Sequence, residues 1–79
     1  MNEPTTTQNV MANIRKIVDD SGLTQQIVGE KMGYPPKSAR QSVSQFLKGD
    51  NPSLAVVVRF ANAMGLGLEE LLEEKEKEK

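Results

Sequence analysis

Cysteine and histidine are both absent from the sequence, which excludes several classes of protein. Without cysteine the chain can form neither disulfides nor thiolate metal sites, and without either residue a metal ion could be held only by carboxylates. A zinc finger is therefore excluded. The sequence also lacks a histidine base, a cysteine nucleophile and a glycine-rich loop that could cradle a phosphate.

The carboxylates that remain are poorly spaced for catalysis. Asp19-Asp20 and Glu69-Glu70 are adjacent in the sequence, so the members of each pair diverge on a helix surface. Acid–base catalysis needs two groups that converge on a substrate. We therefore expect a protein that is not an enzyme, with no catalytic residue, metal, cofactor or evident small-molecule ligand.

Long apolar runs are absent as well. None approaches the roughly 20 residues that a membrane-spanning helix requires, and the first residues lack the pattern of a signal peptide. A chain of 79 residues corresponds to one small domain, which buries only about 60% of its unfolded surface. We expect a single-domain cytoplasmic protein without membrane contact.

Charge is unevenly distributed along the chain, although its net value is only −1. Residues 1–60 carry +2 and residues 61–79 carry −3. No aspartate or glutamate lies between Glu30 and Asp50, whereas four Lys or Arg residues do. Because the potential at a binding face depends on local clustering, the weakly acidic net charge does not exclude a polyanionic partner.

Helix-start and helix-stop signals predict two helices in the first third of the chain. Thr5 and Gln8 have the spacing of a capping box, so we expect the first helix to start near residues 6–8 and to end before Gly22. Thr24 is placed to cap a second, short helix, and Gly33 follows its end.

The start of the third helix has two interpretations. Pro36 could occupy its first turn, or Ser38 could cap it, and the capping-box spacing of Ser38 and Gln41 favours the later start. Gly49 ends this helix. Ser53 is placed to cap a fourth helix, Gly65 closes it, and a short fifth helix precedes the charged residues 73–79.

Apolar spacing predicts the buried side of each helix. The stripes are Val10, Ile14, Ile17 and Val18; Ile27, Val28 and Met32; Ala39, Val43, Phe46 and Leu47; Leu54, Val57, Val58, Ala61 and Met64; and Leu66, Leu68, Leu71 and Leu72. Gly29 lies in the middle of the second helix, where it costs about 1 kcal/mol relative to alanine. We expect a crossing helix to approach closely there.

The third helix has an apolar side and an uncharged-to-basic side. Lys37, Gln41, Ser44, Gln45 and Lys48 fall together on the second side. Amide, hydroxyl and cationic groups suit nucleobase edges and phosphates, since glutamine can bond adenine twice and arginine or lysine can bond guanine. The alternative is an ordinary solvated helix face.

Several motifs then occur in a consistent order: LTQ at 23–25, glycines at 29, 33 and 49, NPSL at 51–54 and ANAMGLGLEELL at 61–72. In this order the chain resembles the phage-repressor and Cro-like (XRE-type) helix-turn-helix family over about residues 10–72. The resemblance implies an all-α, compact five-helix bundle of the lambda-repressor-like DNA-binding type. Its helix-turn-helix would be formed by helices 2 and 3, with the third helix in the major groove.

The resemblance also implies a domain layout and a set of DNA contacts. Residues 1–7 would be a flexible N-terminus, 8–72 the DNA-binding domain and 73–79 a charged, frayed tail. The implied base contacts are Arg40, Gln41, Ser44 and Gln45, and the implied backbone contacts are Thr24, Gln25, Lys37, Ser38, Lys48 and Asn51. Tyr34 could contact the DNA backbone, but we expect its ring to pack over the turn.

The sequence departs from the family pattern in two places. From Gly33 to Gly49 it has about four more residues than is usual, so either the turn is longer or the third helix gains a turn. Alignment from the downstream end makes Val43 the buried residue of the third helix and Ser44 and Gln45 base readers, whereas alignment from the upstream end shifts the reading register. Val18 also occupies a position where many relatives have arginine, which removes one expected backbone contact.

These inferences favour a sequence-specific transcriptional regulator that binds double-stranded DNA as a homodimer on a palindromic site. The alternative is a protein-interaction module, antitoxin-like or a regulatory subunit, that uses a hydrophobic patch on the last two helices of the same fold. RNA binding is disfavoured because it relies on exposed aromatic side chains, and the chain has only one tyrosine and two phenylalanines.

Overall fold

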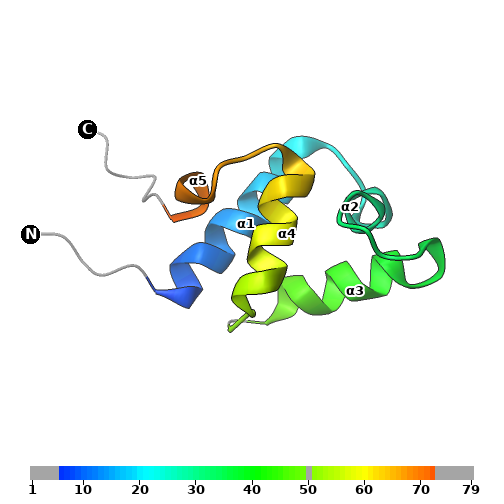
Figure 1. Ribbon diagram of the computed structural model, residues 1–79, viewed down its shortest axis with the longest axis horizontal. Helices are drawn as coiled ribbons and strands as arrows, with labels where there is room; N and C mark the ends of the chain where they lie inside the picture. Colours follow the sequence, from blue (N-terminus) through cyan, green and yellow to red (C-terminus); the bar gives the residue numbers. More distant parts are fainter. Residues whose placement is uncertain (1–5, 50, 73–79) are drawn as a thin grey trace, which may run out of the picture.

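Five helices follow one another along the chain, joined by short loops (Figure 1). The structure, a computed structural model, describes residues 6–49 and 51–72. The helices are α1 (Thr7–Ser21), α2 (Gln25–Lys31), α3 (Pro36–Lys48), α4 (Leu54–Met64) and α5 (Leu68–Leu72). These two ranges contain no strand, so the all-α class and the five predicted helices are confirmed. None of the described helices is long and apolar enough to cross a bilayer.

Some sequence predictions fall outside the described residues. They concern Thr5 of the first capping box, residues 1–5 of the N-terminus, Asp50 of the loop after α3 and the tail 73–79.

Side-chain caps start three of the helices. Thr6 caps α1, with its Oγ1 accepting from the Asn9 N–H at 3.1 Å, so the first cap lies one residue later than predicted. Thr24 and Ser53 cap α2 and α4 as predicted, since their hydroxyl oxygens accept N–H groups at 3.1 and 3.3 Å. These bonds satisfy backbone donors that have no partner within the helix.

The start of α3 differs from the favoured prediction. The helix begins at Pro36 and its N-cap, Pro35, makes no side-chain capping bond. Ser38 lies inside the first turn, where its N–H donates to the Pro35 carbonyl at 3.0 Å. The Ser38 cap and its pairing with Gln41 are therefore wrong. Proline suits this position because its φ is already helical and it has no N–H to leave unsatisfied.

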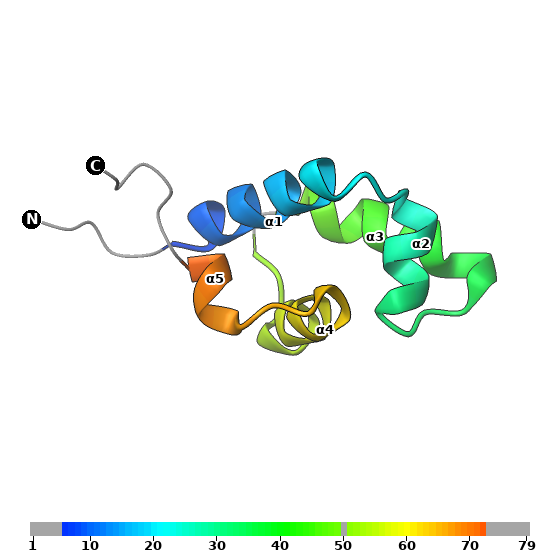
Figure 2. The same ribbon diagram turned by 90° about the horizontal axis from the view of Figure 1, so that it is seen from above.

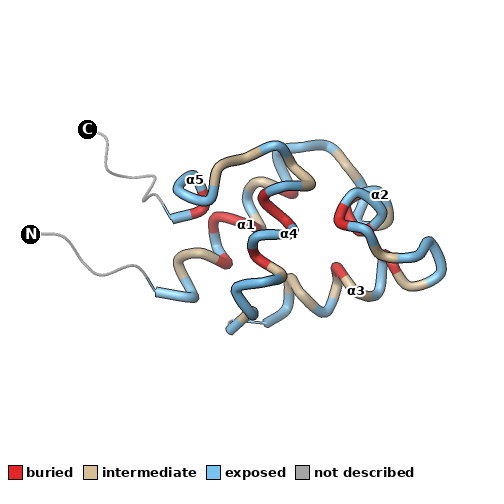
Figure 3. The backbone as a smooth tube through the Cα atoms, in the orientation of Figure 1, coloured by how far each residue is buried: buried red, intermediate tan, exposed pale blue. Residues whose placement is uncertain are grey.

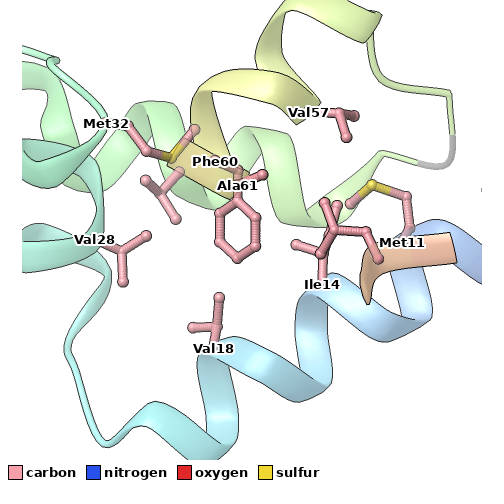
Figure 4. Packing of buried hydrophobic residues seen from close by; sticks show 10 residues of the cluster. Met11, Ile14, Val18, Val28, Met32, Val57, Phe60 and Ala61 are labelled. Carbon is pink, nitrogen blue, oxygen red and sulfur yellow. The ribbon is translucent and has the colours of Figure 1, made fainter. Parts of the chain in front are cut away.

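The core gathers around Phe60 of α4, which is fully buried. Each of the five helices contributes buried positions (Figure 3), and Figure 4 shows how side chains of this core pack. Figure 4 shows its ring between Ile14 and Val18 of α1 and Val28 of α2. The Phe46 ring of α3 lies against it, with the two centroids 5.9 Å apart. The Phe60 side chain of α4 therefore packs against α1, α2 and α3, and α3 is attached to the bundle through its apolar side.

The predicted stripe of α4 is partly wrong. Val57 and Ala61 are buried as expected, but Leu54 is 69% exposed and Val58 is 38% exposed. Phe60, which the prediction omitted, takes the central position. Apolar residues occupy nearly every side of α4, so their spacing alone did not identify the side that faces the core.

The C-terminal leucines complete the core only in part. Leu71 is fully buried, whereas Leu68 and Leu72 are 37% and 40% exposed. Asn13 is a buried polar residue of α1 whose Nδ2 donates to the Leu71 carbonyl at 2.6 Å. This bond joins α1 to α5 and satisfies a carbonyl at the end of the last helix.

Helices α2 and α3 cross at Gly29, as its position within α2 predicted. A Cβ built on Gly29 would lie 2.7 Å from the Ala39 carbonyl carbon and 2.8 Å from the Ala39 Cβ. No side chain fits in that space. Figure 2 shows α2 lying across the N-terminal half of α3, and the absence of a side chain at Gly29 sets how closely the two backbones approach.

Candidate nucleic-acid interface

One side of α3 faces solvent along its whole length. Lys37, Arg40, Gln41, Gln45 and Lys48 are exposed, and Ser44 is half-buried. Because these positions recur every three or four residues, they lie on the same side of the helix. They line a single open recess, which Gln26 of α2 also borders. The structure thus brings together all four predicted base contacts and two of the predicted phosphate contacts.

The opposite side of α3 is anchored in the protein. Ala39 and Val43 are fully buried, and Phe46 and Leu47 pack against the core. This confirms the predicted apolar stripe. The side that carries the candidate base contacts is therefore fixed by packing, although contact with DNA itself stays a prediction.

The recess has a positive electrostatic character. Its lining includes three cations, Lys37, Arg40 and Lys48, and no acid. The carboxylate of Glu30 lies nearby but accepts a hydrogen bond from the Gln26 amide at 2.6 Å. The remaining lining groups are amides and a hydroxyl, which can donate or accept. Such a lining can bond base edges and phosphate oxygens.

The additional residues between Gly33 and Gly49 belong to the helix and not to the turn. Only residues 32–35 separate the end of α2 from the first residue of α3, and α3 is 13 residues long. Ala39 and Val43 are one turn apart and are both buried. Upstream and downstream alignment therefore point the same side of α3 outward, and differ only in which turn of that side they treat as central.

The other predicted backbone contacts lie at the N-terminus of α2 and in the loop after α3. Gln25 is exposed at the first position of α2, beside Thr24, whose hydroxyl is used in the cap. Asn51 is exposed and lines a second recess, together with Gln45 and Tyr34, between α3 and α4. Lys48 is the last residue of α3 and lines the recess along that helix. Three of these side chains thus remain available to a ligand that follows α3.

Ser38 is the predicted contact that the structure separates from the others. It is half-buried and does not line the recess. Its hydroxyl lies 3.5 Å from the Pro35 carbonyl, within the first turn of its own helix. The rotation of α3 places it between the buried side and the solvent side, so it is the weakest of the candidates.

Tyr34 packs over the turn, as expected. Its ring is half-buried against the core, and the Arg59 guanidinium lies 5.4 Å from the ring centroid. Its N–H donates to the Gly29 carbonyl at 3.1 Å, which ties the turn to α2. Arg59 is therefore directed to this ring and does not line the recess along α3.

Arg15 of α1 contacts the C-terminal end of α3, a contact that the sequence did not reveal. Its Nε donates to the Leu47 carbonyl at 2.7 Å and its Nη2 to the Gly49 carbonyl at 3.0 Å. The last carbonyls of a helix have no partner within it, and a cation is favoured there by the helix dipole. Arg15 therefore supplies a cap from another helix.

Gln26 of α2 contacts the N-terminal end of α3. Its Nε2 donates to the Pro36 carbonyl at 3.0 Å as well as to Glu30. Like Arg15, it bonds a backbone carbonyl, a group that every residue carries, so no residue type at the receiving position could have indicated the contact. The sequence signal for this contact is limited to the second glutamine of LTQQ, which places an amide side chain at this position of α2.

Comparison with known families agrees with this geometry. The Helix-turn-helix family model matches residues 14–71, from the middle of α1 to α5. The chain belongs to the XRE-type (Cro/C1-type) helix-turn-helix family. This is a family of DNA-binding proteins and not of enzymes. No curated protein and no solved structure matches the chain.

Membership assigns roles to the described elements. Helices α2 and α3, with Met32 to Pro35 between them, form the helix-turn-helix of a lambda-repressor-like fold. The chain is therefore a DNA-binding helix-turn-helix protein of the regulatory type. The described residues contain no group of three or more histidines, cysteines or carboxylates placed to hold a metal ion.

Proposed function

We propose that this helix-turn-helix protein is a sequence-specific transcriptional regulator that inserts α3 into the DNA major groove. The observation that carries the proposal is the recess along α3. Arg40, Gln41, Ser44 and Gln45 line it between Lys37 and Lys48, and no acid interrupts them. Side chains of these kinds discriminate base pairs at the major-groove edge, where each pair shows a distinct pattern of donors and acceptors.

The flanking residues support a fixed orientation on the duplex. Gln25 is exposed at the N-terminus of α2, and Lys48 and Asn51 are exposed at the end of α3 and in the loop after it. Helix N-termini and cationic side chains bind phosphates, and phosphate contacts set the register without specifying sequence. The protein would thus contact the backbone on both sides of the bases that α3 reaches.

We further propose that two copies bind together on a palindromic site. One α3 covers only a few base pairs, and helix-turn-helix proteins of this geometry reach adequate selectivity by placing two such helices in successive major grooves, about 34 Å apart. We expect the protein to act in the cytoplasm, where its DNA would be.

Selection of oligonucleotides from a random pool tests the proposal. We expect an enriched site with two inverted half-sites, and a specific affinity at least about 10³-fold higher than that for random duplex at the same salt concentration. Enrichment of one unrepeated half-site would contradict the dimer. Equal affinity for all duplexes would contradict sequence-specific binding.

A second candidate function is a protein-interaction module. It is favoured by the exposed side chains Leu54 and Val58 on α4 and Leu68 and Leu72 on α5. Gel filtration combined with a duplex-binding titration separates the two functions. If the protein binds no duplex even at low salt, the interaction module is supported, because the electrostatic part of DNA binding is strongest there.

A further inference from the structure

We propose that Arg15 and Gln26 are positioning residues for DNA recognition, each governing the base contacts made at its own end of α3. Arg15 fixes the C-terminal end and Gln26 the N-terminal end. The inference rests on the proposed function, because it concerns how α3 is presented to the bases. Neither residue is proposed to touch DNA.

At the C-terminal end, Arg15 replaces the usual glycine cap. Gly49 has φ −83° and an extended conformation, so it does not form the left-handed turn that commonly satisfies the last carbonyls. Its N–H donates to the Phe46 carbonyl at 3.3 Å. The Leu47 and Gly49 carbonyls accept from Arg15 instead. A planar guanidinium bound at two points fixes direction as well as distance, which a lysine ammonium cannot do.

At the N-terminal end, α3 has no side-chain cap of its own. The hydrogen bond from Gln26 to the Pro36 carbonyl attaches this end to α2. The two partners of Gln26, the Glu30 carboxylate and the Pro36 carbonyl, can only accept, so the atom that faces them must be the amide nitrogen. Both amide hydrogens are then engaged. The free amide oxygen cannot bond a phosphate, which is also an acceptor. Gln26 therefore borders the recess as a support for α3 and not as a backbone contact.

Between its two ends, α3 is also packed against the bundle independently of both residues. Ala39 lies against Gly29 without space for another atom, and Val43 is fully buried. When one end is released, the helix is expected to bend where it is packed, so that the released end shifts more than the end that is still bonded. Release of the Leu47 end should shift Gln45 more than Arg40, whereas release of the Pro36 end should shift Arg40 more than Gln45.

The test compares base-pair preferences along the selected half-site. Affinities for the site and for each single base-pair variant are measured with the unaltered protein, Arg15→Met and Gln26→Ala. Gln45→Ala and Arg40→Ala show which base pairs depend on each end. We expect Arg15→Met to reduce preference about tenfold at the Gln45-dependent base pairs and less than about twofold at the Arg40-dependent ones. Gln26→Ala should show the reverse pattern.

Two matched variants control for charge and position. Lys16→Met removes the neighbouring cation of α1, whose ammonium pairs with Asp20 at 3.4 Å and does not reach α3. Gln8→Ala removes a glutamine from the second position of α1, the position that Gln26 holds in α2. Both control variants should leave the preference at every base pair of the half-site unchanged. Arg15→Lys, which keeps the cation but not the two-point bond, should fall between the unaltered protein and Arg15→Met.

A purely structural role predicts a different result. Loss of stability lowers the folded fraction and so reduces all affinities by one factor, leaving the ratios between base pairs unchanged. Uniform loss, or the same pattern for Arg15→Met and Gln26→Ala, overturns the inference while the proposed function stands. If the unaltered protein shows no base-pair preference, the proposed function fails and the inference fails with it.

Discussion

At the scale of the residue, Gln45 and Lys48 show how neighbouring positions of α3 can serve different purposes. Both line the same recess, one turn apart. An amide can discriminate between bases through its paired donor and acceptor, whereas an ammonium is attracted to any phosphate. The distinction leads to different expectations for the two kinds of substitution.

We expect Gln45→Ala and Arg40→Ala to lose about 1–3 kcal/mol of discrimination at particular base pairs. Lys48→Ala should weaken binding to all duplexes alike and reduce the salt dependence by about one unit of slope. Titrations of specific and random duplex at several salt concentrations measure both effects. If Gln45→Ala and Arg40→Ala changed affinity equally for every duplex, direct base contact by these residues would be refuted.

Gly29 has a structural role that can be measured separately from binding. An alanine Cβ there would lie 2.7 Å from the Ala39 carbonyl carbon, a backbone atom that cannot move without shifting α3. We expect Gly29→Ala to lower the free energy of unfolding by roughly 1–3 kcal/mol, and the melting temperature by about 4–8 °C for each kcal/mol.

Gly49→Ala is the control for that substitution. Its φ is negative, and the nearest atom to an added Cβ is the Phe46 carbonyl oxygen at 3.8 Å, an ordinary contact distance. The melting temperature should therefore change little. Equal melting temperatures for the Gly29→Ala and Gly49→Ala proteins would show that α2 and α3 do not need the close approach.

At the scale of the element, the helix starts offer a direct comparison between two serines. Ser53 caps α4 through its hydroxyl, but Ser38 caps nothing because α3 already begins at Pro36. We expect Ser53→Ala to cost about 1 kcal/mol and Ser38→Ala to stay within about 0.5 kcal/mol. Urea unfolding of the two variants measures the difference. A larger loss of unfolding free energy for Ser38→Ala than for Ser53→Ala would support the Ser38 cap that the capping-box spacing predicted.

The helices were predictable where their signals are local. Thr24, Ser53, Gly22 and Gly65 act within a few residues of their own helix ends, so the sequence around them was enough. The rotation of α4 was not predictable in this way. Its side facing the core is chosen by packing against α1 and α2, which brings in Phe60 and leaves Leu54 in solvent.

The candidate interface was likewise predictable only where its signals are local. The solvent side of α3 follows from the spacing of its apolar residues, because Ala39 and Val43 can be buried only if Gln41 and Gln45 point outward. The supports at its ends could not be predicted. Arg15 lies 32 residues from Leu47 in the sequence, and it bonds a backbone carbonyl that has no side-chain signature.

At the scale of the whole molecule, the binding charge is concentrated on one side of a chain whose net charge is −1. The cations of the α3 recess are Lys37, Arg40 and Lys48. The four other described cations have different surroundings: Arg15 bonds carbonyls, Lys16 pairs with Asp20, Arg59 lies over Tyr34, and Lys31 lines a separate recess beside Arg59. Local clustering therefore allows a weakly acidic protein to present a cationic face.

This arrangement predicts that the salt dependence of DNA binding will report how many copies bind. The slope of log K against log salt is about −0.9 for each phosphate neutralised. The three recess cations of one copy therefore limit its slope to about −3, and those of two copies on a palindrome limit it to about −5, values that are reached only if Arg40 also neutralises a phosphate. Neutral contacts such as Gln25 and Asn51 add affinity without adding to the slope, since they release no counterion. Titration of the selected site from low to physiological salt, beside a duplex with only one half-site, measures both values. A slope much steeper than about −6 on the full site would mean that cations outside the α3 recess contact DNA, and the assignment of the interface to this one face would then be wrong.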